Sequence, residues 1–174
     1  MNYKSLPIGE KYPEKVIAVI ENPKGTHNKY ELDEELNVIK LDRVLHTAMF
    51  WPFDYGFIPQ TLSGDGDPLD VMVLTDSPTF PGCVTEIRPI GMLITEDEKG
   101  QDEKLLAVQT KNPHYDEIDS LEKVPAHIPK EIAHFYEEMK KLEPGKWVKV
   151  TGWEGKASAL EIIKQAHENY KKGK

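Results

Sequence analysis

The chain of 174 residues has a single cysteine, Cys83, and no long apolar run. One thiol cannot form a disulfide within the chain, which agrees with a reducing compartment. The longest apolar runs, such as Val16 to Ile20, are far shorter than the about 20 residues that a membrane-spanning helix needs. The first residues also lack the apolar stretch of a secretory signal peptide. We therefore expect a cytoplasmic protein without membrane partners.

Basic residues are outnumbered, with 22 Lys and Arg against 30 Asp and Glu and a net charge of −8. Nucleic acids and anionic membranes call for clustered basic side chains, so neither is an expected partner. A small anionic substrate remains compatible, because bound metal ions and a few basic side chains can reverse the local potential. The length and the 39% hydrophobic content fit one globular domain, which we expect to span residues 1–174.

Several familiar catalytic motifs are also missing from the sequence. The six histidines include no HxxxH pair, so they do not indicate a zinc site. The chain has no GxxxxGK[ST] loop, which argues against a P-loop nucleotide triphosphatase. No Ser, Cys or His stands in a recognisable nucleophile arrangement, so a covalent intermediate is not indicated.

Short β-type runs separated by Pro, Gly, Asn and Asp fill the first two thirds of the chain. Their close spacing leaves no room for crossover helices, which favours antiparallel pairing in a small barrel or curled sheet. The expected strands span 16–20, 29–32, 38–41, 55–58, 70–74, 84–94 and 105–109.

Two helices and a further strand are expected late in the chain. Pro129 can open a helix, and Pro144 with Gly145 can stop it. A strand over 146–152 and a second helix over 157–170 should follow, so the fold class is α+β, with a β-barrel core and flanking helices. The apolar stripe of the first helix comprises Ile132, Phe135, Tyr136, Met139 and Leu142.

The most informative segment holds Asp65, Asp67 and Asp70 within six residues, together with Gly66 and Pro68. Carboxylates held this close repel one another, so such a cluster usually binds a divalent cation. Two of the carboxylates can bind the metal while the third accepts a proton from bound water.

A calcium loop is the main alternative metal site, and it fits poorly. Counted from Asp65, position five is Leu69, position six is Asp70 and position twelve is Asp76, where the calcium pattern requires an oxygen ligand, glycine and glutamate. A solvated acidic turn without function is the better competing interpretation at this point.

A second acidic segment spans 95–104 and by itself predicts a hairpin loop that faces water. If it folds over the same barrel mouth, Asp97 and Asp102 add metal ligands and Lys104 adds a cation. Lys29, Arg43 and Tyr55 are individually typical strand-edge residues, yet their donor groups suit phosphate. Together with metal these side chains describe a phosphoryl-binding pocket.

The run from Asp65 to Val71 resembles the signature of the family I soluble inorganic pyrophosphatases. The resemblance implies a closed, five-stranded barrel of the oligonucleotide-binding type with helices outside it. It also implies magnesium-dependent hydrolysis of diphosphate to two orthophosphates, and a homo-oligomer, commonly a homohexamer. Further segments resemble the family in the same order: 19–21, 29–31, 42–43, 47–50, 54–56, 88–91, 132–135 and 145–148.

The resemblance also implies residue roles. Several Mg2+ ions would bind per site, with Mn2+, Co2+ or Zn2+ as possible substitutes. Asp67 resembles the general base. The ligands of the first metal would be Asp65, Asp70 and Asp102, and Asp70 would be shared with a second metal. Glu21 and Asp97 match acidic positions that serve metals arriving with substrate. Glu31 matches another acidic position in that site. The phosphate contacts are Lys29, Arg43, Tyr55, Lys104 and Lys140.

Two positions depart from the family pattern. Met139 stands where many members have a tyrosine that contacts phosphate, and methionine has no donor for that oxygen. Trp51 replaces a commoner tyrosine, which moves the polar tip from a hydroxyl to an indole nitrogen. Neither change removes a metal carboxylate, so activity is still expected.

The expected mechanism is direct attack of a metal-bridging water on phosphorus, with Asp67 as base. One alternative is a metal-dependent phosphohydrolase for nucleotides or sugar phosphates, which needs a larger recognition pocket. Another is a barrel that binds single-stranded nucleic acid through Trp51, Tyr55 and Phe57. The acidic balance and the aspartate cluster count against the second alternative.

Overall fold

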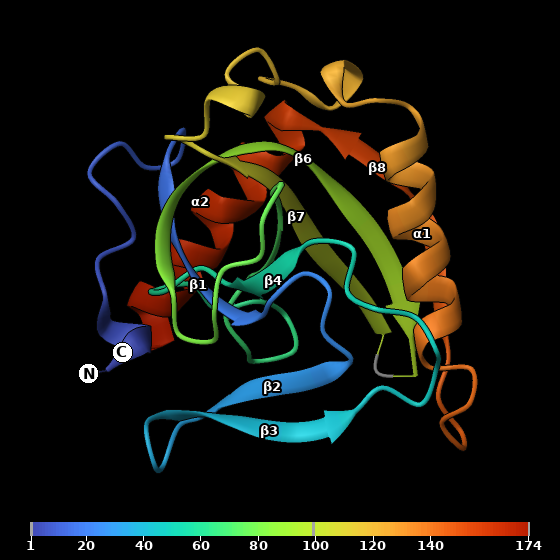
Figure 1. Cartoon of the computed structure of the whole chain (residues 1–174). Helices are drawn as coiled ribbons and strands as arrows, with labels where there is room; N and C mark the ends of the chain where they lie inside the picture. The colour runs from blue at the N-terminus through green and yellow to red at the C-terminus, as the bar shows by residue number, and fades with distance from the viewer. Residues whose placement is uncertain (1, 99, 174) are drawn as a thin grey trace.

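A computed structural model describes residues 2–98 and 100–173 of the chain. Its main sheet has the strand order β1-β4-β5-β7-β6-β8, and β1 also pairs with β6, so five strands close into a ring (Figure 1). This arrangement confirms the expected α+β class and the ring of five strands. The strands of this sheet are β1 (Val16–Asn22), β4 (Asp54–Phe57), β5 (Asp70–Leu74), β6 (Val84–Asp97), β7 (Gly100–Gln109) and β8 (Val148–Gly155).

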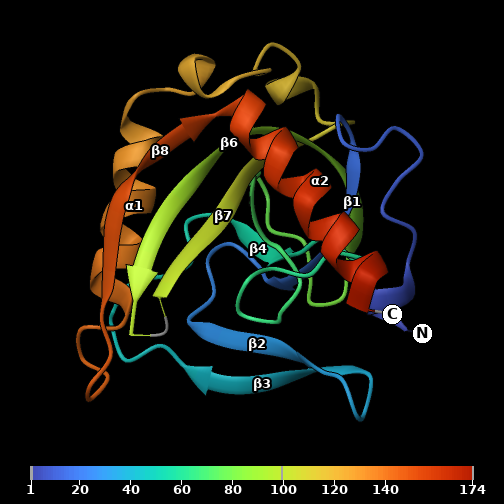
Figure 2. The same cartoon turned by 180° about the vertical axis from the view of Figure 1, so that it is seen from behind.

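The other two strands, β2 (Asn28–Asp33) and β3 (Val38–Val44), form a separate antiparallel hairpin. Figures 1 and 2 show this hairpin lying across one end of the strand ring, apart from the main sheet. The hairpin matches two expected strands, but its detachment from the ring was not expected from the sequence. The hairpin therefore faces one end of the ring across a space that both elements line.

The expectation of antiparallel pairing is wrong for one pair of strands. β5 and β7 run parallel, with Asp70 opposite Lys104 and Leu74 opposite Val108. The reason is that the long strand β6 lies between them in sequence and pairs with β1 at its start and with β7 further along. This parallel register brings the aspartate motif beside the second acidic segment.

By itself, the acidic segment 95–104 predicted a water-facing loop. In the structure it forms instead the paired ends of two strands. Strand β6 continues to Asp97 and β7 begins at Gly100, with Thr95 opposite Asp102. Strand β8 extends the ladder on the other side of β6, with Asp97 opposite Val148. Pairing on both sides of β6 overrides the weak strand preference of these acidic residues.

Helix α1 spans His127–Met139 and α2 spans Lys156–Gly173. Figure 2 shows α2 crossing the ring and α1 running along β8. The predicted apolar stripe of α1 is correct up to Met139 and wrong at Leu142, which is 68% exposed. The helix ends one turn earlier than expected. A tight turn replaces its last expected turn, and in it the Glu143 N–H donates to the Lys140 carbonyl. Three short 3-10 helices span Tyr3–Ser5, Pro113–Tyr115 and Leu121–Lys123.

The hydrophobic core has two parts, one on each side of the ring wall. One part joins Ile163 and Ala166 of α2 to strand residues of β1, β5 and β7. The other joins Phe135 and Tyr136 of α1 to Trp51, with strand residues of β4 and β7. In the described residues, we find no helix with the length and apolar character needed to cross a membrane.

Candidate active site

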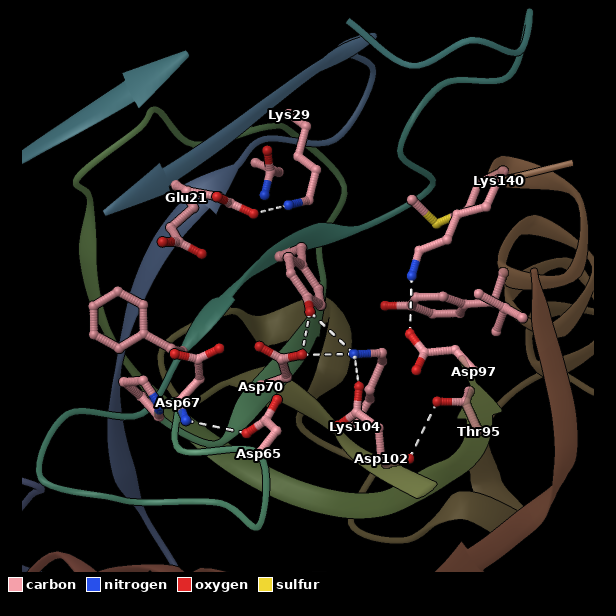
Figure 3. Close-up of a pocket in the computed structure, with 18 of the residues that line it drawn as sticks. Glu21, Lys29, Asp65, Asp67, Asp70, Thr95, Asp97, Asp102, Lys104 and Lys140 are labelled. Carbon is pink, nitrogen blue, oxygen red and sulfur yellow. Dashed lines mark hydrogen bonds and ion pairs between the residues drawn. The ribbon is translucent and has the colours of Figure 1, made fainter. Parts of the chain in front are cut away.

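All of the predicted site residues line one cavity of about 720 Å³. The cavity lies between the ring, the β2–β3 hairpin and the C-terminal end of α1, and Figure 3 shows its charged lining. The structure thus brings together side chains from distant parts of the chain, while their individual roles remain predictions. These residues are Glu21, Lys29, Glu31, Arg43, Tyr55, Asp65, Asp67, Asp70, Asp97, Asp102, Lys104 and Lys140.

Hydrogen bonds from backbone N–H groups to side-chain oxygens shape the aspartate loop. The Asp67 N–H donates to Asp65 Oδ1 at 3.1 Å, and Gly66 has a φ of 92°, which favours glycine. At the base of the loop, Thr61 Oγ1 accepts from the Leu69 N–H at 2.8 Å. The loop therefore leaves Asp65 and Asp67 exposed in the cavity, while Asp70 begins β5.

Lys104 is the central cation of the site. Its Nζ lies 2.6 Å from Asp70 Oδ2 and 2.7 Å from Asp102 Oδ2. Tyr55 also donates its hydroxyl to Asp70, and Lys104 Nζ lies 3.2 Å from the Tyr55 oxygen. Figure 3 shows these contacts as one network on the cavity wall.

The burial of this network shifts its pKa values. Burial disfavours the charge on Lys104, yet Asp70, Tyr55 and Asp102 together hold its pKa well above the ordinary value. Burial raises the pKa of Asp102, and Lys104 offsets part of that rise. Burial also raises the pKa of Tyr55 well above its usual range, so the phenol remains a hydrogen-bond donor.

Glu21 is a buried carboxyl on the opposite side of the cavity. Burial raises its pKa to about 8, with a further rise from Asp70, while the Leu32 N–H, 2.8 Å from Glu21 Oε1, opposes the shift. A β-bulge between Ile20 and Asn22 interrupts the alternation of β1 and re-aims this side chain. Glu21 is therefore largely protonated near neutral pH, and a nearby cation would favour its ionised form.

The remaining predicted phosphate contacts are ion-paired around the cavity. Lys140 lies 3.0 Å from Asp97, and Arg43 Nε lies 3.3 Å from Glu143. Lys29 pairs with Glu31, which lies two residues along the same strand. Each predicted phosphate-binding cation thus has a carboxylate partner within the cavity or at its edge.

The donor set fits hard divalent cations. Acidic side chains outnumber basic ones on the cavity wall, so an anionic substrate requires additional positive charge there. Lys104 Nζ contacts Asp70 and Asp102 together, which shows that one cation can reach both carboxylates. Within residues 2–98 and 100–173, no three His, Cys, Asp or Glu side chains already converge as a metal cluster.

The two departures from the family pattern have structural consequences. The Trp51 indole N–H donates to the Asn28 carbonyl at 3.1 Å, so its polar tip positions β2. Met139 is 3% exposed, ends α1 and lines the cavity without offering a donor. Trp51, Tyr55 and Phe57 are only 2%, 8% and 4% exposed, so they do not form a platform on which bases could stack.

Sequence reasoning missed several other polar residues of the cavity wall. Glu98 and Lys146 lie in segments already singled out, so their motifs offered a signal. Asn22 and Glu143 gave no such signal, because their importance depends on contacts with distant residues. Tyr136 was assigned to the core from helical periodicity, which describes its ring but says nothing about its hydroxyl.

Comparison with known proteins agrees with this geometry. The family model described as inorganic pyrophosphatase matches residues 18–171. The inorganic pyrophosphatase of Aquifex pyrophilus is 53% identical, with 99% of each chain covered. That of Thermus thermophilus is 52% identical, with 98% of each chain covered.

Solved structures show the same likeness in three dimensions. The crystal structure of the Thermus thermophilus inorganic pyrophosphatase matches with a TM-score of 0.97 and 51% identity, covering 98% of this chain and 99% of that one. The Helicobacter pylori enzyme matches with a TM-score of 0.92 and 40% identity over 96% of this chain and 99% of that one. Sequence, fold and cavity lead to one assignment: the chain belongs to the inorganic pyrophosphatase family.

Proposed function

We propose that this protein hydrolyses inorganic diphosphate to two orthophosphates by direct attack of water, with Asp67 as the general base. Family membership supports the reaction. The observation that carries the proposal is the single cavity in which the aspartate loop faces Lys29, Arg43 and Lys104. Hydrolysis of diphosphate needs both basic side chains and carboxylates. The cations bind the anionic substrate, and a carboxylate accepts the proton of the attacking water.

The metal assignment belongs to the same proposal. Asp65, Asp70 and Asp102 would hold the first Mg2+, with Asp70 shared with a second ion. Bound Mg2+ would neutralise charge on the diphosphate and lower the pKa of the attacking water. The carboxylates Glu21, Glu31 and Asp97 also line the cavity and would hold ions that enter with substrate.

The chain's own residues then bind and orient the substrate. Asp67 lies exposed in the cavity, where its carboxylate can accept a proton from water. Lys104 already contacts Asp70, Asp102 and Tyr55, so binding a phosphate oxygen requires it to exchange one of them. Lys140 contacts Asp97 and can bind a phosphate oxygen beside it, because an ammonium group has three donors. Tyr55 remains protonated and can donate its hydrogen bond to the same oxygens once it is released from Asp70.

The first prediction concerns Asp67→Asn. We expect phosphate release from diphosphate in the presence of Mg2+ to fall by about 10²- to 10⁴-fold, because the amide cannot accept the proton. The thermal unfolding temperature should hardly change, since Asp67 is exposed. The measurement is phosphate release from diphosphate and from ATP, with and without Mg2+.

Asp119→Asn is the matched control, because Asp119 is an exposed aspartate outside the cavity lining. It should retain full activity. If purified wild-type protein with Mg2+ leaves diphosphate intact, the proposed function is wrong. If Asp67→Asn turns over like the wild type, only the assignment of the base is wrong. Faster cleavage of ATP than of diphosphate would favour a nucleotide phosphohydrolase instead.

We also propose a cytoplasmic homo-oligomer, with a homohexamer as the expected state. Exposed apolar side chains are candidate contacts between copies of the chain. In the described residues, the large ones lie on or near the β2–β3 hairpin, around residues 80–84 and after α1. Sedimentation velocity at several concentrations measures the oligomeric state, and a monomer throughout would contradict this proposal.

A further inference from the structure

Tyr136 of α1 has a buried hydroxyl that the fold does not use. The side chain is 3% exposed, and its oxygen has no hydrogen-bond partner among the described residues. Buried polar groups are normally hydrogen-bonded, so an exception calls for an explanation. The described residues contain three other such atoms, His27 Nε2, Thr79 Oγ1 and Arg88 Nε.

Of these residues, Tyr136 is the one that lines the active-site cavity. Lys104 Nζ lies 5.6 Å from the centre of its ring and at the same distance from the ring of Tyr55. The two rings are therefore equally close to the Lys104 ammonium, and Tyr55 and Lys104 are both predicted phosphate contacts. Lys140 follows one helical turn later.

The packing of Tyr136 explains its ring but not its oxygen. The ring stacks on Phe53 at 5.9 Å between centroids and meets Phe135 edge-on at 5.6 Å. A phenylalanine would make the same ring contacts without burying a polar atom. Burial raises the pKa of Tyr136 well above its usual range, so its hydroxyl stays a donor at neutral pH.

We propose that the Tyr136 hydroxyl is a substrate-binding group that donates a hydrogen bond to a phosphate oxygen beside Lys104. This inference rests on the proposed hydrolysis of diphosphate and adds a phosphate contact from α1. It also offers a donor one helical turn before Met139, which has none. The same contact would hold orthophosphate, because the product presents the same oxygens.

The test is Tyr136→Phe, which removes one oxygen and keeps the ring. Because the oxygen has no partner among the described residues, the unfolding temperature should stay the same or rise. The KM for diphosphate at saturating Mg2+ should rise by about tenfold, the size typical of losing one hydrogen bond to a charged group, while kcat changes less. The dissociation constant of inorganic phosphate, measured by calorimetry with Mg2+ present, should rise in parallel.

Two control variants separate this role from general effects. Tyr115→Phe makes the same chemical change at a tyrosine whose hydroxyl lies 3.4 Å from Asp76, outside the cavity lining. Thr79→Val removes another hydroxyl that lacks a partner in the described structure, also outside the lining. Both controls should keep the wild-type KM and phosphate affinity.

Each result of this experiment has a clear reading. Values of KM and phosphate affinity within twofold of the wild type in Tyr136→Phe would overturn the inference. A clear fall in unfolding temperature would overturn it as well, because the hydroxyl would then have a structural partner. If the wild type does not hydrolyse diphosphate, the proposed function fails, and phosphate calorimetry still decides whether Tyr136 contacts phosphate.

Discussion

Glu21 combines deep burial with the absence of any ion-pairing basic side chain among the residues that the structure describes. Among the described residues, the donor to its carboxylate is the Leu32 N–H. Burial of a carboxylate in such a place favours the protonated form, which accounts for its raised pKa. A nearby divalent cation would favour the ionised form, so Glu21 links protonation, metal binding and stability at one residue.

The metal-free protein should lose stability through Glu21 as the pH rises. Its folded pKa of about 8 lies above the ordinary glutamate value of 4.5, so the folded state binds more protons between these values and the free energy of unfolding falls with rising pH. Glu21→Gln removes this dependence. At pH 8.5 in EDTA we expect the variant to be more stable than the wild type by about 2 kcal/mol, and at pH 5 the difference should shrink. Urea unfolding at both pH values measures it.

Glu117→Gln provides the control, because Glu117 is an exposed glutamate outside the cavity lining. It should follow the wild type at both pH values. A stability difference between Glu21→Gln and the wild type that is the same at pH 5 and pH 8.5 would contradict the buried-carboxyl explanation. Excess Mg2+ should reverse the order of stability at pH 8.5, since a carboxylate binds the ion more strongly than the neutral amide does.

At the scale of the elements, side chains rather than a strand ladder fasten the β2–β3 hairpin to the ring. Asn22 Oδ1 accepts from the Tyr30 N–H at 2.6 Å, and Asn22 Nδ2 donates to the Tyr30 carbonyl at 3.2 Å. The Leu32 N–H donates to the Glu21 carboxylate, and the Trp51 indole N–H donates to the Asn28 carbonyl. The bulge in β1 places Glu21 and Asn22 where both can reach β2. The position of the hairpin, which carries Lys29 and Arg43, therefore depends on a few side-chain contacts.

We expect Asn22→Leu to loosen this hairpin without unfolding the ring. The leucine is close in size to asparagine but has neither the acceptor nor the donor for Tyr30. Amide hydrogen exchange in residues 28–33 should quicken by about tenfold, while exchange in β5 and β7 stays as in the wild type. The KM for diphosphate should rise several-fold, because Lys29 is less well positioned.

Asn112→Ala is a suitable comparison, since Asn112 is a half-buried asparagine whose side chain also makes hydrogen bonds and which lies outside the cavity lining. It should leave exchange in residues 28–33 unchanged. Asn22→Asp keeps the acceptor for the Tyr30 N–H and should give an intermediate exchange rate. Unchanged exchange in Asn22→Leu would show that the hairpin does not depend on this side chain.

These elements also show what a sequence can predict and what it cannot. The β-type run 70–74 predicted β5 to the residue, because its apolar pattern is local. The parallel pairing of β5 with β7 depends on the path of β6, which no local pattern encodes. The aspartates were identified from their density in sequence, whereas Asn22 and the hydroxyl of Tyr136 gain meaning only from distant contacts.

At the scale of the molecule, the cavity joins parts of the chain that the sequence keeps far apart. Carboxylates come from β1, from the loop before β5 and from both strands of the β6–β7 hairpin, represented by Glu21, Asp65, Asp97 and Asp102. Their mutual repulsion destabilises the metal-free fold, and bound cations remove it. Unfolding disperses these carboxylates, so divalent ions bind the folded state in preference to the unfolded chain.

Removal of divalent metal should therefore lower the stability of the whole protein in a saturable way. At about 100 times the dissociation constant, Mg2+ should add about 2.7 kcal/mol, which corresponds to a rise in Tm of about 5 to 10 °C for a chain of this length. Thermal unfolding with EDTA and with increasing Mg2+ measures the rise. In Asp102→Asn the saturating rise should be smaller and should need more Mg2+, whereas Asp76→Asn, outside the cavity lining, should respond like the wild type.

NaCl at matched ionic strength should raise Tm much less, because screening weakens repulsion without bridging carboxylates. Equal rises with NaCl and with Mg2+ would show that the cavity holds no specific metal site.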